Sequence, residues 1–304
     1  MNTFRRRLGR LALLCGLVLC AVPFPLAAQA QQAAAAGTES GASALLEKHA
    51  ALAGQLAQNA YRRPLFLDSI EGSNAVTGNA YAVLNSPFAT VSGAFKSPRR
   101  WCEMLILHIN TKHCHASTDE SPSQLSMHVG KKTEQALDDA FALKFNYRLT
   151  HSSPDYLAAQ LGADKGPLGT HNYRIELQAV PLPDGKTFMH LRYSYGYGVA
   201  SRLAMQGYLA TAGSGKVGFT QVRRGSVNGY VDGMRGTVER NTMRYYLAIE
   251  AYLASLDKPP AQQFEARLQH WFDATEQYAR QLHEVDKESY LTMKRAEYQR
   301  QQAS

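Results

Sequence analysis

Residues 79–88, NAYAVLNSPF, join a strand pattern directly to a helix start, and this junction decides how the rest of the chain is interpreted. The preceding stretch, residues 76–84, is rich in apolar and aromatic residues and predicts a β-strand. Asn85, Ser86 and Pro87 are typical of a helix N-terminus, where the missing N–H of proline needs no partner. The sequence therefore predicts a strand that runs straight into a helix by way of a proline.

Shorter elements flank this junction on both sides. A helix is expected over residues 44–60, and Pro64 ends it. A strand over residues 65–70 and a turn at 72–74 then lead into the strand at 76–84. Behind the junction, Ser97 and Pro98 interrupt the first helix, and a second short helix is expected to carry Trp101.

The middle of the chain alternates apolar and polar residues with the period of two that indicates strands. The alternating stretches are residues 125–129, 143–149, 173–178 and 189–197, with a continuation at 203–209. No spacer of helix length separates most of them, so the sheet is expected to be antiparallel. Residues 154–170 are expected to form a longer loop or a short helix.

The strongest helix prediction covers residues 238–256, which are apolar almost all round. Such a helix is buried on more than one side. Pro259 and Pro260 end it, and residues 261–304 are expected to form a charged helical tail with a weaker apolar stripe.

The N-terminus has the three parts of a secretory signal peptide. Arginines at 5–7 and 10 precede an apolar run at 11–26, and small residues surround a cleavage site near Ala30. Prolines break that run, which favours cleavage over a membrane anchor. We therefore expect a signal peptide at 1–30, a flexible spacer at 31–43 and an exported protein, periplasmic or secreted.

Two cysteines remain beyond the leader, Cys102 and Cys114. An even pair in an oxidising compartment favours a disulfide. The competing interpretation is a metal site, because His108, His113 and His115 crowd the same segment. Neither cysteine has a second cysteine two to four residues away, as zinc sites usually do, so we favour the disulfide and expect no metal. The histidines then belong to a solvated loop.

The charge balance argues against a nucleic-acid partner. The chain has 33 basic and 25 acidic residues, a net charge of +8. The leader holds four of the arginines and no acid, which leaves a mild +4 on the remaining chain. The glycine-rich stretch 212–216 lacks the Ser or Thr of a phosphate-binding loop, and we interpret residues 212–215 as a bend. No cofactor is expected.

This order of elements resembles the START-like helix-grip fold of lipid-transfer START domains and birch-pollen-allergen relatives. The best local similarity runs from residues 79–88 through Trp101, and residues 239–253 are similar to the family's gripping helix. The resemblance covers residues 44–256 and implies an α+β fold, with a curved antiparallel sheet wrapped around a long C-terminal helix. Residues 257–304 would be an extra helical tail.

In that family the gap between the sheet and the final helix holds a lipid, a sterol or another apolar molecule. The resemblance implies such a cavity here, with tyrosines offering apolar ring faces and a polar hydroxyl. The residues expected to line it are Trp101, Tyr193, Tyr195, Tyr197, Arg244, Tyr245, Ile249 and Tyr252. The alternative, that this stripe is simply core and Arg244 pairs with Glu239 or Glu250, stays open.

We therefore expect an exported, non-enzymatic binding or transfer protein for one hydrophobic or amphipathic small molecule. Opening of a loop near residues 154–169 would admit the molecule. A cyclase- or hydrolase-like enzyme is one alternative, favoured if His190 and Arg192 face inward. A structural protein that binds a partner through residues 257–304 is another. Transient membrane contact and the oligomeric state stay open.

Overall fold

A computed structural model describes residues 41–117, 123–211, 215–224 and 227–303, which belong to the unit Thr38–Ser304. The expected signal peptide, most of the expected spacer and most of the bend expected at 212–215 lie outside the described residues. Residues 41–51 are helical and lead into α2 (Ala53–Ala57). Within the described ranges, no helix combines the length and the apolar character that crossing a bilayer requires.

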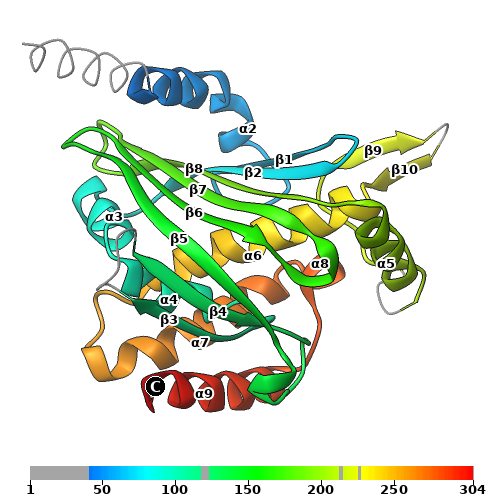
Figure 1. The fold of residues 1–304 in the computed structure, drawn as a ribbon. Coiled ribbons are helices and arrows are strands. Elements are labelled where there is room, and N and C mark those ends of the chain that lie inside the picture. Colours follow the sequence, from blue (N-terminus) through cyan, green and yellow to red (C-terminus); the bar gives the residue numbers. More distant parts are fainter. Residues whose placement is uncertain (1–40, 118–122, 212–214, 225–226, 304) are drawn as a thin grey trace, which may run out of the picture. The chain divides into compact units, whose positions relative to one another are not determined.

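One large antiparallel sheet organises the fold (Figure 1). Its strands follow the order β1-β2-β8-β7-β6-β5-β4-β3. Their bounds are β1 (Leu65–Glu71), β2 (Ala75–Leu84), β3 (Thr111–Ser117), β4 (Gln124–Val129), β5 (Phe141–Ser152), β6 (Leu157–Lys165), β7 (His171–Pro181) and β8 (Thr187–Gly196). The sheet curves around the long helix α6 (Gly233–Ala254), which confirms the predicted α+β helix-grip arrangement (Figure 1).

The strand-to-helix junction folds as its sequence predicts. β2 ends at Leu84, and α3 (Phe88–Phe95) begins directly after Pro87. Pro98 begins α4 (Pro98–Leu105), as expected for proline in the first helical turn. Trp101 of α4 donates from Nε1 to the carbonyl oxygen of Phe95 at 3.1 Å. Because both side chains are buried, this bond fixes α3 and α4 to each other within the core.

The side chains of β8 alternate between two environments. Met189, Leu191, Tyr193 and Tyr195 are buried on the inner face, which α6 covers. His190 and Arg192 lie on the outer face, where Arg192 pairs with Glu176 of β7 at 3.5 Å. α6 itself is buried along most of its length, so its apolar character on several sides is explained by packing on the sheet and on the later helices.

The C-terminal helices pack onto the same core. They are α7 (Pro260–Glu276), α8 (Ala279–Leu282) and α9 (Lys287–Ala303); α7 packs against α6, and α9 packs against α7 and strand β3 (Figure 1). Trp271 donates from Nε1 to the carbonyl oxygen of Arg244 at 3.1 Å, and the Tyr290 hydroxyl donates to that of Leu107 at 2.8 Å. Several side chains of residues 261–303 are therefore part of the core.

A group of buried charges joins α9 to β3. The carboxylate of Glu297 receives the ammonium of Lys112 at 3.0 Å and that of Lys294 at 2.7 Å. Both lysines are fully buried, and Glu297 is 1% exposed. Lys294 also donates to the carbonyl oxygens of His108 and Thr111 at 2.8 and 2.6 Å. These bonds compensate the desolvation of the charges and position α9 on the end of the sheet.

The expected loop at 154–170 is wrong over most of its length. Residues 157–165 form β6, which pairs with β5 and β7 inside the sheet. Its inward positions alternate leucine with alanine, and such small side chains weaken the alternation that indicates a strand. Only a short turn with the 3-10 segment Pro167–Gly169 connects β6 to β7.

The strand continuation expected at 203–209 is also wrong. Residues 199–210 form helix α5 (Val199–Ala210), and β9 (Gln221–Arg224) and β10 (Val227–Tyr230) follow as a separate hairpin. Leu203 and Met205 are apolar and two residues apart, which fits a strand, but Leu203 is exposed on α5, so this spacing did not mark a buried face.

The segment between the cysteines is buried, contrary to the expected solvated loop. His108 and His113 are 3% and 8% exposed, and residues 111–117 form β3. Cys102 of α4 and Cys114 of β3 form a disulfide, with Cα atoms 5.2 Å apart, which confirms the predicted pairing. The disulfide therefore ties α4, with Trp101, to an edge strand of the sheet.

Candidate functional site

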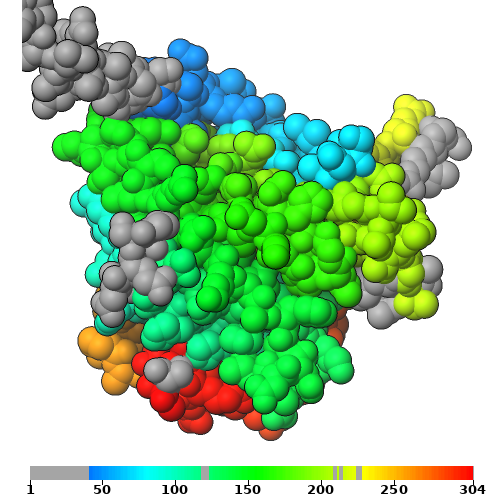
Figure 2. Space-filling model, in the orientation of Figure 1, coloured from blue at the N-terminus to red at the C-terminus, as the bar shows by residue number. Residues whose placement is uncertain are grey.

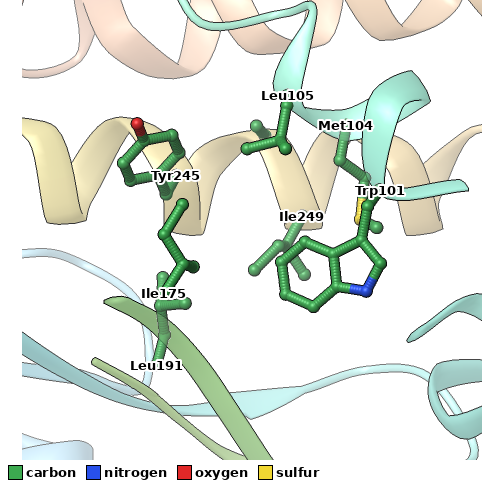
Figure 3. A pocket seen from close by; sticks show the side chains of 8 residues that line it. Trp101, Met104, Leu105, Ile175, Leu191, Tyr245 and Ile249 are labelled. Carbon is green, nitrogen blue, oxygen red and sulfur yellow. The ribbon is translucent and has the colours of Figure 1, made fainter. Parts of the chain in front are cut away.

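A small apolar cavity lies where the sequence places the ligand site, between α6 and the sheet. Its walls come from α4, β7, β8 and α6 (Figure 3). They are Trp101, Met104, Leu105, Ile175, Leu191, Tyr245, Ala248 and Ile249. In Figure 3 the side chains of Trp101 and Ile249 approach each other from α4 and α6, while Ile175 and Leu191 rise from the strands.

This cavity is almost filled by its own side chains. It holds about 10 Å³ of space for the centre of a water-sized sphere. That is about the space of one water molecule. Seen from the outer face of the sheet, strands β5 to β8 form a continuous surface, so the interior has no opening through the sheet (Figure 2). The cavity expected from the resemblance is therefore almost filled in this structure.

Beside this cavity, four tyrosines from three elements form a cluster, which we call the tyrosine cluster: Tyr173 of β7, Tyr193 and Tyr195 of β8, and Tyr245 of α6. The ring centroids of Tyr173 and Tyr195 lie 5.3 Å apart, and those of Tyr193 and Tyr245 lie 5.2 Å apart. Because side chains alternate between the two faces of a strand, Tyr193 and Tyr195 of β8 both point to the inner face of the sheet. There the ring of Tyr193 contacts that of Tyr245 from α6. The cluster is mainly apolar, with hydroxyls at its margins.

The hydroxyl groups of this cluster are unevenly satisfied. The Tyr173 hydroxyl hydrogen-bonds with the hydroxyl of Thr170 at 2.8 Å. Within the described part of the chain, the hydroxyls of Tyr193, Tyr195 and Tyr245 have no hydrogen-bond partner, and none of them is completely covered. Burial raises the pKa of all three, so they are neutral and can each donate and accept a hydrogen bond.

The connection between β6 and β7, residues 166–170, lies against this cluster; we call it the β6–β7 turn. Leu168 and Gly169 have positive φ angles of 54° and 76°. Ser201 of α5 donates from Oγ to the carbonyl oxygen of Leu168 at 2.8 Å. Together with the bond between Thr170 and Tyr173, this contact holds the turn and α5 next to the tyrosines.

Three of the residues expected in the cavity lie elsewhere. Tyr197 is one of them: its hydroxyl donates to the carbonyl oxygen of Gly72 at 3.2 Å, and its ring is not part of the cavity wall. Tyr252 is covered by the guanidinium of Arg267, 4.5 Å from its ring centroid. Trp101, Tyr245 and Ile249 line the cavity, and Tyr193 and Tyr195 lie next to it.

Arg244 points away from the sheet, toward the C-terminal helices. Its guanidinium pairs with Glu284 at 2.7 Å, and Lys132 and Lys216 reach the same carboxylate at 2.8 and 3.3 Å. These three cations lower the pKa of Glu284 against the opposing effect of burial. The expectation that Arg244 pairs with Glu239 or Glu250 is therefore wrong, because the acceptor comes from the tail.

The sequence interpretation missed His108 as an interior residue. Its ring lies 4.8 Å from that of Tyr245, and Nδ1 accepts from the backbone N–H of Asn110 at 3.2 Å. Nε2 is buried without a hydrogen-bond partner among the described residues. Burial, then the charges of Arg244 and Lys294, lower the pKa of His108 well below its usual value. The apolar run Leu105–Leu107 before it was the available signal of burial.

The described residues contain no group of three or more His, Cys, Asp or Glu side chains placed to hold a metal ion. His113 of β3 and His128 of β4 form a pair, with ring centroids 5.7 Å apart. A pair alone does not complete a site of the kind that zinc occupies in proteins.

Comparison with known proteins finds similar folds at low identity. No protein-family model matches the chain, and no curated protein does. Norcoclaurine synthase from Thalictrum flavum is 12% identical over 47% of this chain and 77% of its own, with a TM-score of 0.32. Human StAR-related lipid transfer protein 5 is 10% identical over 57% and 90%, with a TM-score of 0.31.

An aromatase/cyclase named Zhui, from Streptomyces sp. R1128, is 10% identical over 72% of this chain and all of its own, with a TM-score of 0.31. At such identities and scores, a similarity concerns the arrangement of elements and says nothing about ligand or activity.

Proposed function

We propose that this chain is a binding protein that takes an apolar or amphipathic small molecule between α6 and strands β7 and β8. The observation that carries the proposal is the tyrosine cluster, where three inward-facing hydroxyls have no partner among the described residues. Because none of these hydroxyls is completely covered, each is free to bond to solvent or to a ligand. A ligand with an apolar body and one polar group would pack on the rings and take the place of that solvent.

Binding requires the interior to expand, because the cavity has room for only about one water molecule. The β6–β7 turn is the element that we propose to move. It has no strand partners of its own, and Ser201 and Tyr173 hold it by two side-chain hydrogen bonds. This replaces the longer mobile loop expected from the sequence, since β6 is paired on both sides and cannot detach alone.

Export of this binding protein remains part of the proposal. It rests on the arginine-led apolar run at residues 5–26 and on the small residues near Ala30. The location would be the periplasm or the outside of the cell, where the Cys102–Cys114 disulfide would be stable.

An enzymatic use of the interior receives no support from the residues that would favour it. On the outer face, Nε2 of His190 hydrogen-bonds with Oδ1 of Asn79 at 3.0 Å, and Arg192 forms an ion pair with Glu176. A role through a free tail is equally unsupported, because Trp271 and Tyr290 of the tail are buried.

A reversible lock on the β6–β7 turn tests the proposal. A Cβ atom at position 169 would lie 3.2 Å from Oγ of Ser201, within reach of a disulfide between G169C and S201C. The positive φ at position 169 strains any side chain there, and this strain is the same in the oxidised and the reduced double variant. Binding of the amphipathic probe anilinonaphthalene sulfonate is followed by stopped-flow fluorescence. We expect the oxidised double variant to bind more than about tenfold more slowly than the reduced one.

The single variant S201C, under the same oxidant and reductant, controls for loss of the hydroxyl and for effects on the native disulfide. Equal probe kinetics in the oxidised and reduced double variant would overturn the proposed opening. Native mass spectrometry of the protein purified from its own compartment is the second arm. Absence of any co-purified small molecule, together with no probe binding, would overturn the function itself.

A further inference from the structure

A second and much larger space lies on the outside of the molecule, at the β1 edge of the sheet. It is an open cleft of about 430 Å³, formed by four separate segments. These are the end of α2 with residues 58–61, strand β1, the hairpin residues 219–221 and 230, and the segment 277–281. A volume of this size is within the range of small-molecule sites. Residues of this cleft do not line the interior cavity.

Aromatic rings form much of the wall of this cleft. Phe219 meets Tyr278 edge to face, with centroids 5.6 Å apart, and Tyr61 lies 6.0 Å from Phe219. On the opposite hairpin, the guanidinium of Arg280 lies 4.9 Å from the centroid of Tyr230. Tyr61, Tyr230 and Tyr278 are half-buried, so each keeps part of its surface available to a ligand.

Primary amides supply the polar part of the wall. Gln55, Gln58, Gln221 and Gln281 all line the cleft, and none of their side chains hydrogen-bonds to another described residue. Gln281 is the informative one, because it is only 7% exposed. Its amide is not among the fully covered polar atoms, so it reaches the cleft. The Gln281 amide therefore has a carbonyl acceptor and two N–H donors that are available to hydrogen-bond to a polar ligand.

The wall is held in place by a buried carboxylate behind it. Glu239 of α6 is fully buried and accepts from the backbone N–H groups of Phe219 and Thr220 at 2.6 and 2.9 Å. The Ser69 hydroxyl of β1 donates to the same carboxylate at 2.6 Å. These bonds hold Phe219 and Thr220 against β1 before any ligand binds. Such preorganisation reduces the entropy cost of binding.

The charge of the side chains that line the cleft argues against a cationic ligand. Among the described residues that line the cleft there is no Asp, Glu, His or Lys, and Arg280 is the single ionised side chain. A cationic ligand would find no counter-charge. Flat ring faces next to unused primary amides match a ring-shaped ligand with apolar C–H faces and adjacent hydroxyls, since each hydroxyl can donate to and accept from an amide.

We propose that this cleft binds a neutral saccharide, stacked on Tyr230 and hydrogen-bonded to Gln281. The site is separate from the interior one, and neither proposal depends on the other. An extended peptide could use the same amides through its backbone, and it is the alternative that the experiment distinguishes.

The full-length mature protein is applied to an array of neutral glycans, and the strongest binder is then measured by isothermal titration calorimetry. We expect the Gln281→Ala variant to bind it about tenfold more weakly, the loss of roughly one buried hydrogen bond. Tyr230→Ala should weaken binding similarly, whereas Tyr230→Phe should retain most of it because the ring face is kept. Gln269→Ala, on the exposed surface of α7 and outside the cleft, should leave affinity unchanged.

Thermal unfolding accompanies each variant, so that a folding defect is separated from a binding defect. No binding to any glycan on the array would overturn the proposal. So would equal losses for Gln281→Ala and Gln269→Ala. Direct calorimetric binding of a polyglutamine or tyrosine-rich peptide that Gln281→Ala weakens, in the absence of glycan binding, would assign the cleft to peptides instead. Because the G169C/S201C lock does not touch the cleft, its outcome leaves this test independent.

Discussion

The outer cleft of this protein is much larger than the interior cavity, and its lining is more polar. The interior, where the sequence pattern is most regular, holds about 10 Å³ and is walled by apolar side chains. The cleft holds about 430 Å³ and is walled by amides and rings from four segments. Large inward-facing residues such as Tyr193, Tyr195 and Trp101 fill the interior as they form it. Open space remains where separate segments meet at the sheet edge.

The largest expected difference concerns stability. Trp101→Ala in the interior should lower the free energy of unfolding by about 3–5 kcal/mol, because it creates a cavity and removes the bond to Phe95. Tyr230→Ala in the cleft should cost about 1 kcal/mol or less, since its ring is half-buried. Chemical denaturation of both variants measures the contrast. Similar losses at the two positions would show that the cleft is as much a part of the core as the interior.

Removing the disulfide should affect the interior and spare the cleft. The double variant C102S/C114S is expected to lose about 3 kcal/mol of stability, because the bond closes a chain loop and anchors α4 to β3. Neither cysteine lies among the residues of the cleft. Denaturation gives the stability, and the glycan affinity of the folded fraction gives the state of the cleft. A loss of that affinity would couple the two regions.

Stability of the interior should depend on pH, whereas binding in the cleft should not. Burial and the charges of Arg244 and Lys294 lower the pKa of His108, so the unfolded chain takes up a proton first, near pH 6.5. The stabilisation is complete above that pH and is lost as the pH falls below it, at up to about 1.4 kcal/mol per pH unit. His190, with its pKa lowered to about 4 mainly by burial, adds a loss between about pH 6.5 and 4.

Urea unfolding at a series of pH values measures this slope, and His108→Asn should reduce it. The lining of the cleft contains no histidine or carboxylate among the described residues, so glycan affinity should stay level between about pH 5 and 8. A slope that His108→Asn leaves unchanged would assign the pH dependence to other groups.

The smallest expected effect is that of Tyr195→Phe. Its hydroxyl has no partner among the described residues, so removing it should change stability by less than about 0.5 kcal/mol. The same change should weaken binding of anilinonaphthalene sulfonate, since we assign the hydroxyl to the ligand. Tyr147→Phe is the matched comparison, because the Tyr147 hydroxyl donates to the carbonyl oxygen of Phe95 at 2.9 Å. It should lower stability without altering probe binding.

Much of this fold is predictable from local patterns. The period of two in β8 and the all-round apolar character of α6 identified both correctly, because burial on one or several sides dictates them. β6 was missed because Ala159 and Ala163 give little apolar contrast. α5 was misassigned because Leu203 and Met205 imitate a strand alternation, although Leu203 is exposed on the helix.

The sites were less predictable for a different physical reason. A strand pattern shows that Tyr193 and Tyr195 face inward, but it does not show how completely their rings fill the space. The cleft depends on residues such as Gln55 and Gln281, which are 226 positions apart and meet only in the folded chain. No local pattern marks either one. The partner of Arg244 was missed for the same reason, because Glu284 approaches from the tail.

The buried ammonium groups of Lys112 and Lys294 also make the rate at which α9 separates from β3 measurable. Reagents that acylate surface lysines cannot reach either nitrogen while α9 is docked, because both side chains are fully covered. Modification of these two lysines can then proceed no faster than α9 separates from β3. Peptide mass mapping over time would read out that separation directly, with the exposed Lys258 as the internal standard.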